Sequence, residues 1–261
     1  MAETIKLYKR SNRALQPSQI EALARHLHVD GKTQQTDEAL ACHDGTRTLA
    51  YAQPCTRFAG LLFFSDQSVA WGDATGKVLD AKRAQAWTQD LLAKFDLLPK
   101  AEGAALDFHL EAHETEAIVF DGKERRRVKA KTDVLSQLLL DGIPVVGPRA
   151  KVRGVFKSAE RPVMLHIGLW DSVAVHETRE RLREHDVVRS VQERLAQREN
   201  CGAKGYDLCD MRLVYMAGEF NGAPDLLAPE YHVEIQLRET HGRARPAAQG
   251  PRQVLRLPAW R

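Results

Sequence analysis

The chain has 261 residues, of which 43% are hydrophobic and 28% are charged, and its formal net charge is +3. These values are typical of a soluble globular protein with one large core or two or three small ones. So small a net charge gives no support for a nucleic-acid partner. The longest apolar runs, 58–64 and 134–140, are far shorter than the roughly 20 residues of a membrane span.

The first twelve residues, MAETIKLYKRSN, contain no apolar stretch typical of a signal peptide. The sequence as given therefore predicts a cytoplasmic protein. A secreted or periplasmic protein whose leader had been removed would show the same N-terminal pattern. None of the four cysteines lies in a C-x-x-C motif, which argues against a zinc ribbon or a thioredoxin-like site. In the cytosol we expect free thiols, and in an oxidising compartment each neighbouring pair is a possible disulfide. The pairs are Cys42 with Cys55 and Cys201 with Cys209.

The first third of the chain predicts a short strand at 5–8, one helix and several strands. Ser18, with Glu21 three residues later, is typical of a helix N-cap with a capping box. Asp44-Gly45 predicts a hairpin between strands at 38–43 and 48–52, and a further strand is expected at 58–65.

In the middle third, Asp80 is expected to cap a helix over 81–95. Strands are expected at 105–113, 116–120 and 125–130. Asp141-Gly142 followed by Ile143-Pro144 predicts a corner, because glycine tolerates positive φ and a residue before proline avoids the helical region. Alternating residues then predict an antiparallel pair of strands at 151–156 and 163–170.

The last third predicts a long charged helix from about 173 to 197, a loop at 201–210, strands at 211–216 and 231–237, and a flexible tail from Thr240. A helix followed by a meander thus recurs three times. This recurrence predicts an α+β fold with helices packed on antiparallel sheets. The expected division is 1–79, 80–171 and 172–239, with 240–261 as the tail.

Three segments resemble the propeptide modules that precede thermolysin-type metalloproteases and the related PepSY-like domains. They are the central LSQLLLDGIPVVGPRAKVRGVF (135–156), the helix AKRAQAWTQDLLAKFDLLP (81–99) and the C-terminal MRLVYMAGEFNGAPDLLAPEYHVEIQL (211–237). The resemblance implies cystatin-like units of a bacterial accessory protein that acts as an inhibitor, chaperone or regulator. Such modules carry no catalytic residues, so none is transferred. The sequence as given departs from the family pattern because it shows no leader, and it contains no protease domain for a propeptide to guard.

The segment 107–113, DFHLEAH, places His109, Glu111 and His113 on one face of a strand. Two imidazoles and a carboxylate are suitable ligands for zinc or iron, and His232 and Glu234 on another strand are possible further ligands. The competing interpretation, which we favour, is the solvent-exposed side of an antiparallel strand.

Other polar residues give weaker indications of chemistry. His166, His232 and Glu234 are the weak catalytic candidates, and a histidine among apolar residues is more often structural. The basic run 123–131 suits phosphate or an acidic peptide, but no aromatic residue interleaves with it, so we expect no nucleic-acid partner.

No G-x-S-x-G, P-loop or dinucleotide-binding motif is present. We therefore expect a non-catalytic binding or regulatory protein without a cofactor, which holds a peptide or protein partner through sheet edges or a concave sheet face. The alternative is a pocket-containing enzyme of a biosynthetic pathway, with a divalent metal at His109, Glu111 and His113. A third possibility is an oligomer subunit that associates through the long charged helix.

Overall fold

The computed structural model describes residues 3–53, 60–69, 77–120, 122, 124–168, 170–196, 203–217, 226–239 and 249–260. Within these residues the chain forms sixteen β-strands, one short 3-10 helix and three α-helices: α1 (Pro17–His26), α2 (Ala81–Lys94) and α3 (Glu184–Ala196). The fold is mainly β, so the expectation of an α+β fold with recurring helix-then-meander units is wrong. None of the described helices is long and apolar enough to cross a membrane.

The chain divides into two compact units. We call Arg10–Ala174 with Ala217–Asp225 the central unit, and Met1–Lys9, Val175–Met216 and Leu226–Arg261 the terminal unit. Two strands, β1 (Thr4–Ser11) and β12 (Ser172–Glu180), each run from one unit into the other. The expected boundary at 79/80 lies inside the central unit, and the three-part division remains a prediction.

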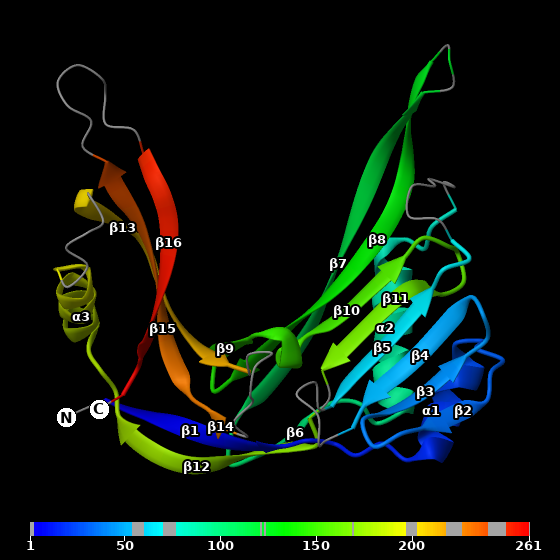
Figure 1. Cartoon of the computed structure of the whole chain (residues 1–261), viewed down its shortest axis with the longest axis horizontal. Coiled ribbons are helices and arrows are strands. Elements are labelled where there is room, and N and C mark those ends of the chain that lie inside the picture. Colours follow the sequence, from blue (N-terminus) through cyan, green and yellow to red (C-terminus); the bar gives the residue numbers. More distant parts are fainter. Residues whose placement is uncertain are drawn as a thin grey trace. The chain divides into compact units, whose positions relative to one another are not determined.

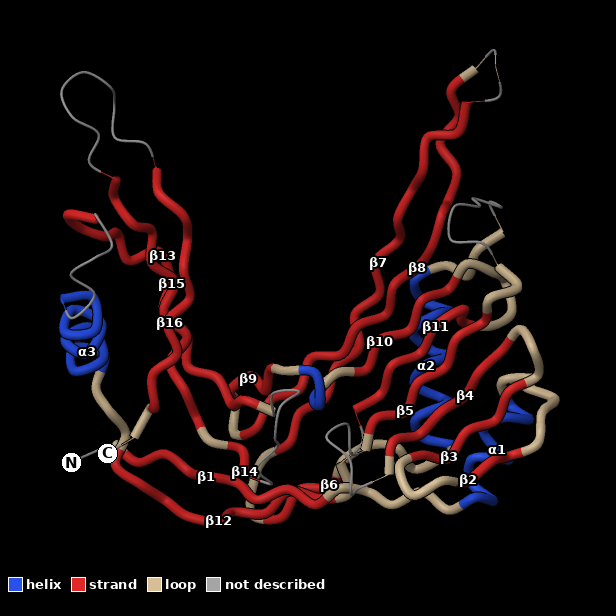
Figure 2. Tube along the Cα trace, viewed as in Figure 1, coloured by secondary structure: helices blue, strands red, loops and turns tan. Residues whose placement is uncertain are grey.

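The central unit contains an antiparallel sheet with the strand order β9-β8-β10-β11-β5-β4-β3-β2 (Figures 1 and 2). β9 and β10 pair with different parts of the same side of β8, and β7 pairs with the opposite side. The strands are β2 (Thr33–Gln35), β3 (Ala39–His43), β4 (Arg47–Ala52), β5 (Leu61–Asp66), β7 (Leu106–Phe120), β8 (Arg125–Leu140), β9 (Ile143–Val146), β10 (Val152–Phe156) and β11 (Pro162–Gly168). The two hairpins expected from the sequence, β3–β4 and β10–β11, are confirmed. The two strands expected at 105–113 and 116–120 form one strand, β7.

Two short elements complete this unit. The strand β6 (Lys100–Glu102) pairs in parallel with the first residues of β12, and the 3-10 helix η1 (Pro148–Ala150) follows β9.

Helices α1 and α2 pack on the same face of the central sheet (Figure 1). Every second residue of the strands points toward them, and together they form one hydrophobic core. The Asp80 carboxylate accepts the Arg83 backbone N–H at 2.9 Å, which confirms the expected cap of α2. The prediction that Ser18 caps this helix is wrong. α1 begins at Pro17, and the backbone N–H of the preceding Gln16 donates to the Gln19 side chain at 2.9 Å.

The corner at Asp141-Gly142 is a two-residue turn between β8 and β9. Leu140 pairs with Ile143, and both turn residues have positive φ, 48° and 78°. Two positive φ angles define the turn type that matches the twist of a hairpin, and Asp-Gly is a preferred sequence for it. The local sequence therefore determined this corner.

The terminal unit contains a three-stranded antiparallel meander of β13 (Ala203–Met216), β15 (Pro229–Glu239) and β16 (Gln249–Pro258). A short strand, β14 (Leu226–Leu227), pairs with β1. Tyr8 and Tyr215 meet edge to face at 5.3 Å, and the Tyr231 hydroxyl accepts from Arg181 and donates to the Leu182 carbonyl. These buried aromatic rings join the meander to two segments that precede it in the chain, β1 and the residues just after β12.

Three expectations for the last third were wrong. Residues 172–180 form β12, and α3 begins only at Glu184. The β-branched Val173 and Val175 occupy alternate positions, which is the strand spacing, whereas the helical spacing starts at Val187 and Val191. The expected loop at 201–210 is strand from Ala203 onward. The expected tail contains β16, and residues 240–248 lie outside the described part of the chain.

A large-to-small substitution tests the central core. The Phe156 ring is fully buried and meets Trp87 of α2 edge to face at 5.5 Å. We expect Phe156→Ala to lower the free energy of unfolding by about 3–5 kcal/mol, because it removes buried area and leaves a cavity. Urea unfolding measures the loss, and Phe120→Ala, at a residue that is 66% exposed, is the matched control with a change below about 0.5 kcal/mol. Equal losses in both variants contradict the assignment of the core.

Candidate binding face and edge of the central sheet

The face of the central sheet opposite α1 and α2 carries rows of side chains that cross many strands. We call it the open face, because no α-helix among the described residues of this unit packs on it. Directly paired residues of an antiparallel sheet point to the same side. One continuous row of paired residues on this face is Glu111, Leu135, Arg153, His166, Phe63, Ala50 and Ala41.

This row combines apolar and positively charged groups. Phe63 and Leu135 are 42% and 39% exposed, so each presents part of a large apolar side chain on this face. Between them lie Arg153 and His166. Arg153 donates to Asp133 at 3.1 Å and remains partly exposed. The open face thus presents apolar, positively charged and titratable side chains on one surface.

His109, Glu111 and His113 lie on one side of a strand, as expected from the sequence. They point to the open face from β7 and are more than half exposed. His109 Nε2 lies 2.8 Å from the Asp107 carboxylate, and His113 Nε2 lies 3.8 Å from that of Glu111. In the described part of the chain, no three His, Cys, Asp or Glu side chains lie in an arrangement that could hold a metal ion.

His166 lies on the same face but three strands away from Glu111. Neighbouring strands lie about 4.8 Å apart, so about 14 Å separates the backbones of β7 and β11. Burial lowers the pKa of His166, with further contributions from Lys151 and Arg153. The open face therefore brings this histidine and the three residues of β7 onto one surface without joining them in one site.

His232 and Glu234 belong to β15 of the terminal unit. Burial lowers the pKa of His232, and its Nε2 lies 3.7 Å from the Glu230 carboxylate, which also binds Arg256 at 2.7 Å. Glu234 accepts a hydrogen bond from Arg252 at 2.9 Å. Both residues are parts of cross-strand charge ladders that stabilise the meander.

Two of the hollows formed by the described residues lie elsewhere in the chain. An open depression of about 340 Å³ beside α3 is lined by Val187, Arg194, Leu257 and Trp260 among others, and none of the candidate histidines lines it. A cavity of about 20 Å³ beneath Trp170 is large enough for about one water molecule. Neither hollow provides a catalytic pocket for the residues singled out from the sequence.

The long edge of β7 is the second feature of this site. All fifteen of its residues pair with β8, and no other described strand pairs with its outer edge. β7 contains four carboxylates and no lysine or arginine. Asp107 and Glu111 point to the open face, and neither has a lysine or arginine ion-pair partner among the described residues. An exposed edge of this length is a template for an added strand.

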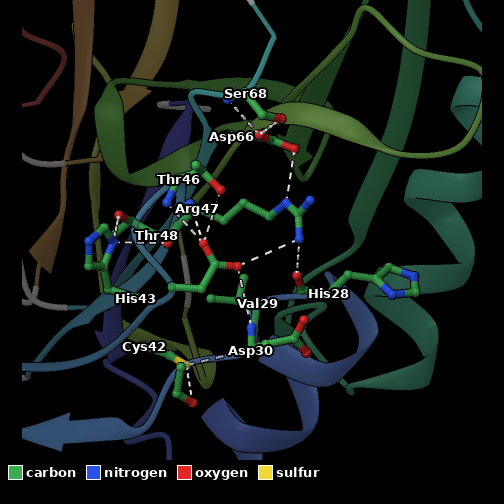
Figure 3. Close-up of polar contacts among 12 residues, drawn as sticks. His28, Val29, Asp30, Cys42, His43, Thr46, Arg47, Thr48, Asp66 and Ser68 are labelled. Atoms are coloured by element: carbon green, nitrogen blue, oxygen red, sulfur yellow. Dashed lines mark hydrogen bonds and ion pairs between the residues drawn. The ribbon is translucent and has the colours of Figure 1, made fainter.

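A dense polar network joins the end of α1 to β4 and β5 (Figure 3). Arg47 donates to the His28 carbonyl at 2.5 Å and to Asp66 at 3.3 Å. The Asp44 carboxylate accepts the backbone N–H groups of Arg47 at 2.8 Å and Thr46 at 3.0 Å. Each group has a local structural partner, so the network holds the β3–β4 turn.

The described cysteines are free thiols. Cys42 is buried and its Sγ donates to the Gly31 carbonyl at 3.0 Å. Burial raises the pKa of this thiol, which disfavours the reactive thiolate. Cys209 is exposed on β13. Cys55 and Cys201 lie outside the described residues, so both possible disulfides remain untested.

Comparison with known proteins identifies a related fold and no family. No protein-family model and no curated protein matches the sequence. An uncharacterized protein from Eubacterium rectale, known from its crystal structure, is similar with a TM-score of 0.53 and 11% identity, over 98% of this chain and 84% of that chain. At this identity the similarity shows the fold alone, and the resemblance to PepSY-like modules remains a prediction.

Sequence reasoning missed Phe63, Leu135 and the free edge of β7. The exposure of Phe63 and Leu135 depends on which strands are neighbours, and β7 had been divided into two strands. The one available signal was the unbroken alternation of polar and apolar residues from Asp107 to His113.

The polar network predicts a pH dependence of stability. Burial opposes ionisation of Asp44, but hydrogen bonds from Arg47, Thr46 and Asp30 outweigh it and lower the pKa to about 2. Because the unfolded pKa is about 3.9, this carboxylate stabilises the fold above about pH 4, and the contribution is lost as the pH falls toward 2. We expect the free energy of unfolding to fall less steeply between about pH 4 and pH 2 in Asp44→Asn than in the wild type, as measured by urea unfolding. Identical slopes contradict the role of Asp44.

Proposed function

We propose that the protein is a non-catalytic binding protein that holds an extended segment of a partner protein as an additional strand on the outer edge of β7. The observation that carries the proposal is that this fifteen-residue strand pairs on one side only among the described residues. Strand addition gains affinity from main-chain hydrogen bonds and specificity from alternate side chains.

The side chains of β7 define the chemistry of the partner. On the open face, an added strand lies beside Asp107, His109 and Glu111. On the other face it lies beside Phe108 and Leu110. Opposite charges in neighbouring strands are favourable and like charges are not. The partner segment therefore alternates basic and apolar residues.

The open face supports a binding role over catalysis. Its titratable groups are spread along and across strands, whereas general acid–base catalysis needs groups that converge within hydrogen-bond reach of one substrate. The exposed Phe63 and Leu135 provide apolar contact area for the body of the partner beside the added strand.

A pair of model peptides tests the proposal. One is an extended peptide of about ten residues in which lysine alternates with valine and threonine, and the other has glutamate in place of lysine. We expect the wild type to bind the lysine peptide and not the glutamate peptide, as measured by fluorescence anisotropy. We expect Asp107→Lys with Glu111→Lys to weaken binding of the lysine peptide about tenfold, because two attractive cross-strand pairs become repulsive.

The matched control is Glu21→Lys with Asp90→Lys, which changes the net charge equally at exposed positions on α1 and α2. It is expected to leave peptide binding unchanged. The proposal is wrong if neither peptide binds, or if the control weakens binding as much as the edge variant does.

A further inference from the structure

The end of the β7–β8 hairpin extends beyond the rest of the central sheet (Figures 1 and 2). β10 pairs with β8 only from Thr132 to Leu135, so residues 125–131 of β8 pair with β7 alone. We call residues 116–120 and 125–131 the arm. It is a two-stranded ribbon to which no third strand pairs among the described residues.

The arm exposes apolar side chains beside arginines. Ile118 is 67% exposed and Phe120 is 66% exposed. In the register of the hairpin, Ile118 lies opposite Arg127 and Phe120 lies opposite Arg125. Paired residues share a face, so each apolar side chain neighbours a guanidinium group.

The charge of the arm is strongly basic. Its β8 strand carries Arg125, Arg126, Arg127, Lys129 and Lys131, and its β7 strand carries only Glu116. The Glu116 carboxylate lies 3.9 Å from Arg127, and both side chains are more than half exposed. An ion pair of this kind contributes little and leaves the guanidinium available to another anion.

An isolated two-stranded ribbon is only marginally stable in water, and large exposed apolar side chains mark interaction sites. The arm has both properties and a concentrated positive charge. A polyanionic partner suits the positive charge, and its contact with the two apolar side chains would remove them from water.

We propose that the arm binds duplex DNA, with its arginines on the phosphates and Ile118 and Phe120 against the groove. A two-stranded β-ribbon fits the major groove of DNA, and ribbon proteins that bind the minor groove use arginines together with apolar wedges. Arg125 and Arg127 lie about 7 Å apart along one face of the strand, so they reach separate phosphates. This function is separate from strand addition, which uses the acidic edge of β7 nearer the body of the sheet.

An anionic membrane is a less suitable partner for this arm. In the register of the hairpin, Ile118 and Phe120 lie directly opposite Arg127 and Arg125. Burying the two apolar side chains in the hydrocarbon of a membrane would therefore draw these guanidinium groups toward it, which is costly. In a DNA groove, the same guanidinium groups meet phosphates.

The sequence alone argued against nucleic acid because no aromatic residue interleaves with the basic run. The fold changes that argument, because β7 supplies Phe120 directly opposite Arg125. The aromatic group comes from a different strand of the same ribbon.

The test uses the full chain and a fluorescein-labelled DNA duplex of about 20 base pairs, with anisotropy measured at several salt concentrations from about 50 mM. We expect Arg125→Ala, Arg126→Ala and Arg127→Ala together to weaken binding at least about tenfold and to reduce the slope of log affinity against log salt by about 2 to 3. We expect Ile118→Ser with Phe120→Ser to weaken binding without changing the slope, because it removes no charge.

Two further variants separate the arm from bulk charge and from misfolding. Arg25→Ala, Lys82→Ala and Arg83→Ala together remove three positive charges from exposed positions on α1 and α2, and we expect them to leave the affinity unchanged. The triple Arg→Lys variant of the arm keeps the charges and is expected to retain most of the binding. Thermal unfolding checks that each variant is folded.

Three outcomes overturn the proposal. The first is that the wild type does not bind the duplex at low salt. The second is that the control on the helices loses as much affinity as the arginine variant. The third is that the protein binds vesicles of phosphatidylserine but not DNA, which assigns the arm to a membrane surface instead.

Discussion

The pairing of β8 is the constraint on which the central unit depends. One side of this strand pairs with β7 along its length, and the other pairs with β10 and, after the Asp141-Gly142 turn, with β9. A slip of one residue moves every side chain of a strand to the opposite face. The register of β8 therefore fixes both which residues enter the core beneath α1 and α2 and which form the open face.

The two faces of the central sheet have different physical roles. On the helix side, fully buried residues such as Phe64, Phe156 and Leu165 supply the hydrophobic stabilisation. On the other side, the partly exposed Phe63 and Leu135 provide less of this stabilisation and are available to a partner. The polar network around Arg47 also stabilises the central unit, because its carboxylates and guanidinium group have partners within the unit.

The β7–β8 hairpin carries two surfaces of opposite charge because one strand is rich in carboxylates and the other in arginine and lysine. Near the body of the sheet, the acidic edge of β7 dominates. From Arg125 to Lys131 the basic strand dominates, and no third strand among the described residues pairs with this part of β8. Both proposed activities are binding functions, in agreement with titratable groups that lie along strands rather than converge in a cavity.

The sequence by itself determined the features that depend on neighbouring residues: the Asp80 cap, the turns at Asp44-Gly45 and Asp141-Gly142, and the shared face of His109, Glu111 and His113. It did not determine the mainly β architecture, because charged segments such as 203–216 have no strong local preference and become strands through pairing with other segments. Only the tertiary structure placed His166 on the same face as Glu111. It also placed Phe120 opposite Arg125. Strand order and register, which no local pattern encodes, decide such neighbours.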